Sequence, residues 1–338
     1  MAAAAVKRDI PPRLALPLAA FLAACNARSE PVAPAPRPVP VASASASAST
    51  EPAAVPAASA VAPPSVSLAD DLAARTAAAR SVFGPHARTR VVGDVYLLAG
   101  PPALGGLFDQ TAALVERALR PLFRGRFSRR PDAAITVLLF ASKRSYDDYV
   151  ALHYGPLGAN KYGVYHPATR EIVADESEGP ELVPTVTHEI VHPIIEADFP
   201  HAPLWFNEAV ASVFEAPEFP PDGGIRGTKR NWRHPQLTAT LRSKSGREKV
   251  HLGALFGMGG VKFLAWSPDA GVDLGENLLH CAMARAFAVW LDEQGKLWPF
   301  YQAWRDGFAA DPTGRKAFLS VMGVTPEAAD AAWLAWVK

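Results

Sequence analysis

The sequence predicts an α+β fold in which a lobe with a mixed β-sheet comes first and a mainly helical lobe follows. Residues 134–140 form a short, almost entirely apolar run that is typical of a buried strand. Residues 161–166 and 170–174 are two β-rich pieces joined by Pro167-Ala168-Thr169, which indicates a hairpin. From residue 181 onward apolar residues recur at helical spacing, except in a stretch rich in Gly and Pro at 216–275. Strand patterns followed by helix patterns indicate this fold class.

The first 25 residues have the layout of an export signal. Three basic residues precede an apolar run at 14–24, which is shorter than the roughly 20 residues that a membrane-spanning helix needs. The run ends in Leu22-Ala23-Ala24-Cys25, which resembles the lipobox of bacterial lipoproteins, where the signal is cleaved before the cysteine and the thiol receives a lipid. This resemblance implies a lipoprotein signal peptide at 1–25 and a membrane anchor at Cys25. An ordinary signal peptide with a chance cysteine is the alternative.

A tether follows the signal. Residues 26–66 contain nine prolines, many Ala and Ser, no Gly and no aromatic residue, so they are predicted to be disordered. Residues 67–338 are long enough for one folded domain of two lobes. We therefore expect an exported, lipid-anchored protein of the bacterial cell envelope, located in the periplasm or on the outer surface.

The overall charge excludes one class of partner. Lys and Arg number 34 against 33 Asp and Glu, so no global field attracts nucleic acid, and none is expected as a partner. Only one cysteine besides Cys25 is present, Cys281. Once Cys25 is acylated, no disulfide can form within the chain, and the fold must depend on its core.

The remaining elements are assigned from periodicity. The pattern predicts the following elements, in order: a helix at 68–82, a strand near 89–99, a helix with an apolar face at 104–122, the strand at 134–140, a helix near 144–153, the hairpin, and a helix at 278–291.

A metal-binding pattern lies in the first helix after the hairpin. Residues Thr187-His188-Glu189-Ile190-Val191-His192 contain the HExxH motif within a segment that is apolar at helical positions. Two His four residues apart share one helical face, so both imidazoles can reach one ion. Glu189 lies close enough to polarise a water without binding the ion itself. This pattern predicts Zn²⁺ bound by His188 and His192, with Glu189 as general base.

A third ligand is predicted on the next helix. Residues 203–211 read Pro-Leu-Trp-Phe-Asn-Glu-Ala-Val-Ala, after a turn-prone stretch. Two antiparallel helices can face each other here, and Glu208 would then project toward the same ion. Two His and one Glu leave a fourth position open for water, which is typical of catalytic zinc.

The two motifs together resemble the gluzincin metallopeptidases, in particular the short "peptidase MA-like" family, whose second motif reads roughly Pro-x-Trp-Leu-Asn-Glu-Gly-Leu-Ala. The segment Tyr162-Gly163-Val164-Tyr165-His166 and the helix at 278–291 are similar to that family's flanking sequences, so the resemblance covers residue 134 to the C-terminus. It implies a zincin-like fold, in which a mixed sheet packs on the HExxH helix, and hydrolysis of peptide bonds in a peptide or protein substrate.

Three residues depart from the family pattern. Pro193 follows the second His directly, so the helix must kink there or end early. Ala209 replaces the usual Gly. Ser212 stands where some gluzincins carry an Asp that supports a ligand His, so that support is expected from Glu196, Asp198, Glu215 or a backbone carbonyl.

Some candidate residues have two readings. His280 is the predicted donor to the oxyanion, since it lies near the start of a helix where the family often has Tyr, and a solvated His is equally compatible with its position. Tyr162, Tyr165 and Arg285 are weaker alternatives. The hairpin could offer an edge strand to an extended peptide or be an ordinary sheet edge. The basic residues between 226 and 249 are interpreted as a solvated face.

The leading hypothesis is a zinc metallopeptidase. Two alternatives remain open. One is a non-catalytic, zinc-stabilised envelope lipoprotein that binds proteins or cell-wall components, and the other is a zinc hydrolase of non-peptide bonds.

Overall fold

The computed structural model describes residues 67–154, 162–177, 179, 183–229, 231–267 and 271–338. The predicted signal peptide with Cys25 and the predicted tether lie outside the described residues. Among the described residues, no helix is both long and apolar enough to cross a membrane.

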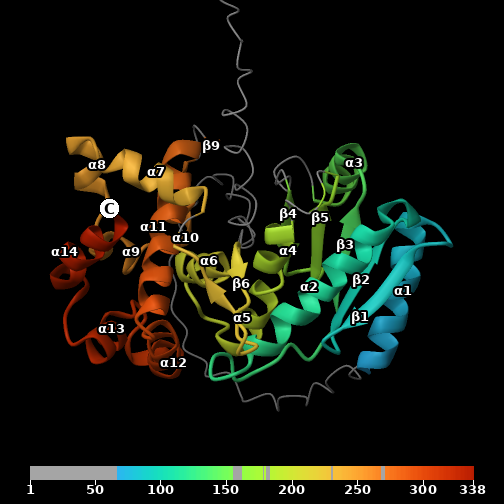
Figure 1. Ribbon diagram of the computed structural model, residues 1–338, viewed down its shortest axis with the longest axis horizontal. Helices are drawn as coiled ribbons and strands as arrows, with labels where there is room; N and C mark the ends of the chain where they lie inside the picture. The colour runs from blue at the N-terminus through green and yellow to red at the C-terminus, as the bar shows by residue number, and fades with distance from the viewer. Residues whose placement is uncertain (1–66, 155–161, 178, 180–182, 230, 268–270) are drawn as a thin grey trace, which may run out of the picture.

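A mixed sheet forms the first lobe, as predicted. Its described strands are β1 (Arg88–Val92), β2 (Tyr96–Gly100), β3 (Ile135–Phe140), β4 (Gly163–His166) and β5 (Glu171–Asp175). They are ordered β1-β2-β3-β5-β4, with β2, β3 and β5 parallel and with β1 and β4 antiparallel to their neighbours (Figure 1). The predicted hairpin is therefore confirmed, and β4 is an edge strand of this sheet.

The predicted single strand at 89–99 is wrong in one respect. The chain turns at Gly93 and Asp94, which both have positive φ angles of 59° and 71°, and this turn divides the segment into β1 and β2. Gly adopts this backbone conformation readily and Asp tolerates it better than most residues, which suits a tight turn.

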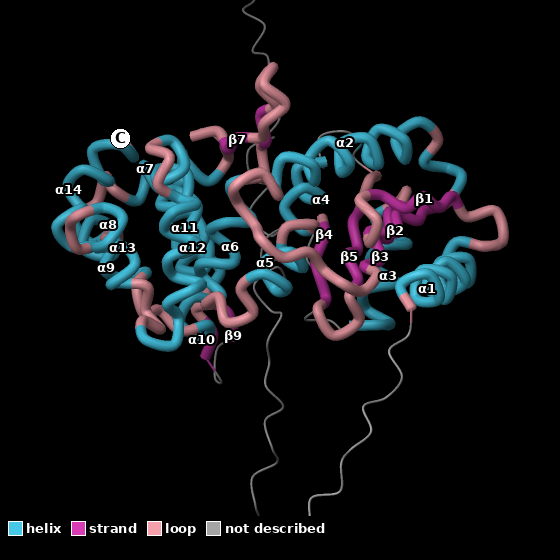
Figure 2. The backbone as a smooth tube through the Cα atoms, turned by 90° about the horizontal axis from the view of Figure 1, so that it is seen from below, coloured by secondary structure: helices cyan, strands magenta, loops and turns pink. Residues whose placement is uncertain are grey.

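Three helices cover the two faces of the sheet. They are α1 (Leu68–Phe83), α2 (Gly106–Leu122), which follows a short 3₁₀ helix at Pro102–Leu104, and α3 (Lys143–Tyr154). Helix α2 lies on one face, while α1 and α3 lie on the other (Figure 2). The apolar residues of β3 point alternately into these two layers, which explains why the strand is buried along its whole length.

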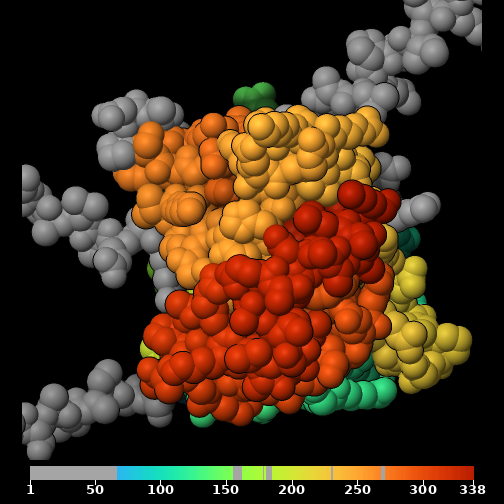
Figure 3. Space-filling model, turned by 90° about the vertical axis from the view of Figure 1, so that its left-hand side faces the viewer, coloured from blue at the N-terminus to red at the C-terminus, as the bar shows by residue number. Residues whose placement is uncertain are grey.

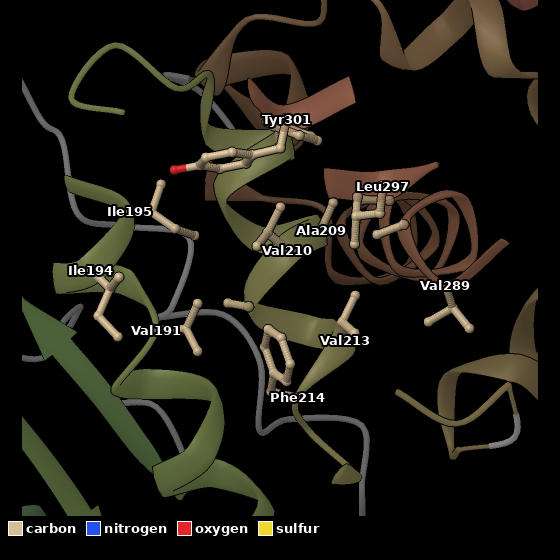
Figure 4. Packing of buried hydrophobic residues seen from close by; sticks show 14 of the residues in the cluster. Val191, Ile194, Ile195, Ala209, Val210, Val213, Phe214, Val289, Leu297 and Tyr301 are labelled. Carbon is tan, nitrogen blue, oxygen red and sulfur yellow. The ribbon is translucent and has the colours of Figure 1, made fainter. Parts of the chain in front are cut away.

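The centre of the molecule consists of three short helices, α4 (Val183–Glu189), α5 (His192–Asp198) and α6 (Leu204–Val213). Helix α4 packs against β4, β5 and α2. The apolar side chains of α6 lie between those of α5 and those of the C-terminal lobe, including Val289, Leu297 and Tyr301 (Figure 4). One continuous hydrophobic core therefore joins the two lobes through α6.

The C-terminal lobe is mainly helical, as predicted. Its described helices are α7 (Arg233–Thr240), α8 (Lys244–Lys249), α9 (Leu252–Leu255), α10 (Gly260–Phe263), α11 (Leu274–Glu293), α12 (Leu297–Gly307), the 3₁₀ turn η4 (Phe308–Ala310), α13 (Arg315–Met322) and α14 (Pro326–Val337). Helix α11 is buried over most of its length and packs against α6. On the outer face, the C-terminal helices lie against the segment that contains α7 to α9 (Figure 3).

The stretch at 216–275 is more regular than predicted. It contains α7 to α10 and two pairs of very short strands, β6 (Pro217–Glu218) with β7 (Arg226–Gly227) and β8 (Trp266–Ser267) with β9 (Gly271–Val272). Helices of four to eight residues are too short to show a clear apolar periodicity, so the Gly and Pro content dominated the sequence pattern.

Candidate metal centre

The HExxH segment forms two short helices with a break between them. Helix α4 ends at Glu189 and α5 begins at His192, with Pro193 in its first turn. Pro is favoured there because it lacks the N–H that the first turn leaves unpaired. Of the two outcomes predicted for Pro193, the early end of the helix is the one observed.

The break is compensated by a residue of the sheet. In a continuous helix the carbonyl of Ile190 would accept a bond from the residue four positions later. Here it accepts a hydrogen bond from the hydroxyl of Tyr96, at 2.7 Å. Tyr96 lies on β2 and is almost fully buried, so the sheet fixes the position of the turn that separates the two His.

The side chains of His188, His192 and Glu208 lie close to one another and to Glu189. The Nε2 atom of His188 lies 3.5 Å from Oε2 of Glu208, and Nε2 of His192 lies 3.8 Å from Oε1 of Glu208. The Nε2 atom of His192 also lies 3.7 Å from Oε2 of Glu189. His188, Glu189 and His192 form a buried group that could hold a metal ion. Two ligands of tetrahedral zinc are about 3.3–3.5 Å apart, given Zn–N and Zn–O bonds near 2.0–2.1 Å.

The polar atoms of this group fit a metal. His188, Glu189, His192 and Glu208 are each at most 5% exposed. Nevertheless, four of their side-chain atoms have no hydrogen-bond partner: Nε2 of each His, Oε1 of Glu208 and Oε2 of Glu189. Buried polar atoms without partners are costly, and several at one place need an explanation. A divalent cation bound by His188, His192 and Glu208 would satisfy three of them.

Glu189 is held in place beside the candidate ligands. Its carboxylate accepts a hydrogen bond from the backbone N–H of Tyr165 on β4. Burial raises the pKa of Glu189 to about 7, with a further increase from the charge of Glu208 and an opposing effect of His188. A carboxylate with a pKa near neutrality can both accept and return a proton.

The two His differ in their electrostatics. Burial lowers the pKa of His192 to about 4, so this imidazole is neutral and able to bind a metal. Burial also opposes the charged form of His188, but the carboxylates of Glu208 and Glu215 outweigh it and raise the pKa to about 10.

Each His has a polar neighbour at its other nitrogen. Nδ1 of His192 is 2.7 Å from Oδ1 of Asn207, and Nδ1 of His188 is 3.4 Å from Oε1 of Glu215. The sequence analysis named several residues that could hydrogen-bond a ligand His in place of Ser212. Of these, Glu215 is the one that lies beside His188. Glu196 instead accepts a hydrogen bond from the Tyr165 hydroxyl, and Asp198 accepts bonds from Ser128, Arg129 and Arg305.

Of the other predicted residues, His280 and Arg285 contact other parts of the structure, whereas Tyr165 lies beside this centre. The Nδ1 atom of His280 is 3.0 Å from the carbonyl of Phe263, and its Nε2 faces Glu276 at 3.8 Å. Among the described residues, no recorded contact joins His280 to His188, Glu189, His192 or Glu208, and its role as a donor to the oxyanion stays a prediction. Arg285 donates to the backbone carbonyls of Ser212, Thr228 and Lys229. Tyr165 is closer to the ligands, since its ring lies nearly parallel to that of His192.

The sequence did not single out Asn207 or Arg233. Asn207 directly precedes Glu208 in the second motif, and this position was the available signal. Arg233 was included in the basic run that was interpreted as a solvated face. That interpretation holds for Arg242, Lys244, Arg247 and Lys249, which are exposed, but Arg233 is 1% exposed and pairs with Glu215.

No protein-family model matches this chain, and no curated protein matches it. Its function is therefore inferred from the geometry and chemistry of the site.

Proposed function

We propose that this protein is a zinc-dependent metallopeptidase with a zincin-like fold, similar to the gluzincins. His188, His192 and Glu208 hold the ion, and Glu189 is the general base. The observation that carries this proposal is the convergence of four buried polar atoms without hydrogen-bond partners, all of them from the two motifs.

The surrounding fold supports the proposal in two ways. The HExxH helix packs on a mixed sheet, with the edge strand β4 beside it. The third ligand comes from α6, which is fixed in the core shared by both lobes. A site built on packed helices holds its ligands more precisely than one built on loops.

The chemistry assigned to this chain's residues is hydrolysis. A zinc ion at this place would polarise a water molecule and the carbonyl that the water attacks. Glu189 takes a proton from the water as the oxygen bonds to the carbonyl carbon. When the C–N bond breaks, Glu189 returns this proton to the leaving nitrogen, so the residue is regenerated.

The proposal includes a location. Anchored through a lipid at Cys25, the domain would act on peptide or protein substrates outside the cytoplasm, in the periplasm or on the outer surface.

The test combines metal analysis with peptide digestion. We expect the purified full chain to contain about one zinc per molecule, because two imidazoles and one carboxylate converge, and to cleave members of a diverse peptide library. His188→Ala and His192→Ala should each abolish stoichiometric zinc. His86→Ala is the matched control, because His86 is an exposed residue of the sheet lobe, and it should retain the metal.

Two outcomes would overturn the proposal. Unchanged zinc in both ligand variants would refute the metal site. Stoichiometric zinc without cleavage of any peptide would favour the zinc-stabilised binding protein, or a hydrolase of other bonds, over the peptidase.

A further inference from the structure

We propose that Glu215 positions the metal ligand His188, and that the buried guanidinium of Arg233 holds Glu215 in this role. This inference rests on the proposed metal site. Ser212 stands where some gluzincins carry an Asp that supports a ligand His. We assign this supporting role to Glu215, three positions later.

The backbone brings Glu215 to His188. Glu215 follows the C-terminal end of α6, the helix that carries Glu208. The carbonyl of Phe214 accepts a hydrogen bond from the hydroxyl of Thr187, at 2.8 Å. Since Thr187 precedes His188, this bond ties the turn before Glu215 directly to the HExxH helix.

The His188 ring lies between two carboxylates, one at each nitrogen. Nε2 faces Glu208 at 3.5 Å, and Nδ1 faces Glu215 at 3.4 Å. The second distance is slightly longer than an ordinary N–H···O hydrogen bond, and Nδ1 of His188 makes no hydrogen bond in this arrangement, with the Glu215 carboxylate as its nearest acidic neighbour. When Nδ1 carries the proton and donates it to Glu215, Nε2 keeps its lone pair for a metal, so the carboxylate selects both the tautomer and the ring orientation.

Hydrogen bonds from Arg233 fix the position of the Glu215 carboxylate. The arginine Nε lies 3.1 Å from both carboxylate oxygens, and its Nη2 donates to Oε1 at 2.5 Å. Asn231 donates to Oε2 at 3.0 Å, and Nε of Arg285 lies 3.8 Å from the same oxygen. Glu215 is 4% exposed, and a buried charge needs such partners. These bonds hold the carboxylate in place beside Nδ1 of His188.

Ser212 cannot take this part. Its backbone carbonyl accepts from Arg285, and a serine hydroxyl carries no charge and has a much shorter reach than a carboxylate on two methylene groups. Glu215, which Arg233 holds in the turn after α6, therefore supplies the carboxylate that Ser212 lacks.

A purely structural role for the Glu215–Arg233 pair predicts something different. The pair would then stabilise the fold by joining α6 to the start of α7, and its loss would lower thermal stability without changing the zinc affinity of the folded protein. Positioning of His188 predicts that zinc affinity falls. Metal ligands that lose a hydrogen-bonding neighbour of this kind typically lose 10- to 100-fold in affinity.

The experiment measures the zinc dissociation constant of the full chain by competition with a chromogenic chelator, alongside its melting temperature. We expect Glu215→Gln to weaken zinc binding about 10- to 100-fold. Glu215→Asp keeps a negative charge for Arg233 but shortens the side chain by one methylene group. It should also weaken zinc binding, by about tenfold or more.

Asp198→Asn is the matched control. It breaks another ion pair of a buried carboxylate, between Asp198 and the half-buried Arg305 at 2.9 Å. No contact joins this pair to the candidate ligands among the described residues. It should lower the melting temperature and leave the zinc dissociation constant unchanged. A second readout is the Nδ1–H resonance of His188 in proton NMR of the zinc-bound protein, which should shift in Glu215→Gln and stay in place in the control.

The outcomes are distinct. Zinc binding within twofold of wild type in Glu215→Asp, and in Glu215→Gln if it folds, would overturn the positioning role while leaving the metal site intact. If Glu215→Gln does not fold, Glu215→Asp decides alone. A wild-type chain that binds no zinc would refute the proposed function, and this role with it.

Discussion

Replacement of Glu189 by Gln separates catalysis from metal binding. The amide has nearly the same shape as the carboxylate, and its oxygen can still accept the hydrogen bond from the backbone N–H of Tyr165. Glu189 is not one of the three proposed zinc ligands. We therefore expect Glu189→Gln to fold and to retain about one zinc per chain.

The expected loss of activity is large. An amide cannot take the proton from the attacking water, and removal of a general base typically reduces the rate by about 10² to 10⁴. This corresponds to roughly 3 to 5.5 kcal/mol in the free energy of activation, at about 1.36 kcal/mol for each factor of ten. A change of shape alone at a buried position that keeps its hydrogen bond would cost much less.

The assay is kcat/KM for a cleaved peptide at saturating zinc, with zinc content and melting temperature measured on the same samples. Glu196→Gln is the control, because Glu196 is another carboxylate near the site and accepts its hydrogen bond from the Tyr165 hydroxyl. It should lose less than about tenfold, since it handles no proton in the reaction. Cleavage by Glu189→Gln at the wild-type rate would refute the assignment of the base.

Four further changes test other parts of the structure. Glu208→Gln should weaken zinc binding as well as activity, because an amide is a poorer zinc ligand, and undiminished zinc affinity would exclude Glu208 as a ligand. Tyr96→Phe leaves the buried carbonyl of Ile190 without a donor and should lower the free energy of unfolding in urea by about 1–3 kcal/mol, so an unchanged value would contradict the compensation of the helix break. Burial raises the pKa of Glu176 to about 7, above an unfolded value near 4.3, so stability should fall as the pH rises from about 4 to 7. Glu176→Gln should therefore raise the melting temperature more at pH 8 than at pH 5, and equal shifts would count against this pKa. Cys25→Ser should move the protein from the membrane fraction to the soluble one or block its processing, and unchanged membrane retention with an uncleaved leader would refute the anchor.

Local patterns predicted most of the first lobe. The apolar run at 135–140 and the hairpin at 163–175 were recognisable because burial and turn chemistry are encoded within a few neighbouring residues. The turn at Gly93 was missed, since the residues on both sides have strand character and only a single Gly marks the change of direction.

The candidate ligands were predictable for a related reason. His188 and His192 are four residues apart, a spacing that brings two side chains to one face of a helix, and they remain close although α4 ends at Glu189 and α5 begins at His192. Glu208 required one further assumption, that the next helix turns back on the first, and the contacts between α4, α5 and α6 agree with it.

Arg233 shows why the surroundings of the ligands could not be predicted in the same way. In the sequence it is one basic residue among several, and nothing nearby distinguishes it from Arg242, which is exposed. A charged side chain is buried only where an opposite charge compensates for the loss of water. For Arg233 that partner is Glu215, eighteen positions earlier, and only the fold of the turn after α6 brings the two together. The candidate ligands were recognisable from the spacing within two short motifs, whereas the residues beside them depend on contacts between elements. Such contacts leave no periodic signal in a single sequence.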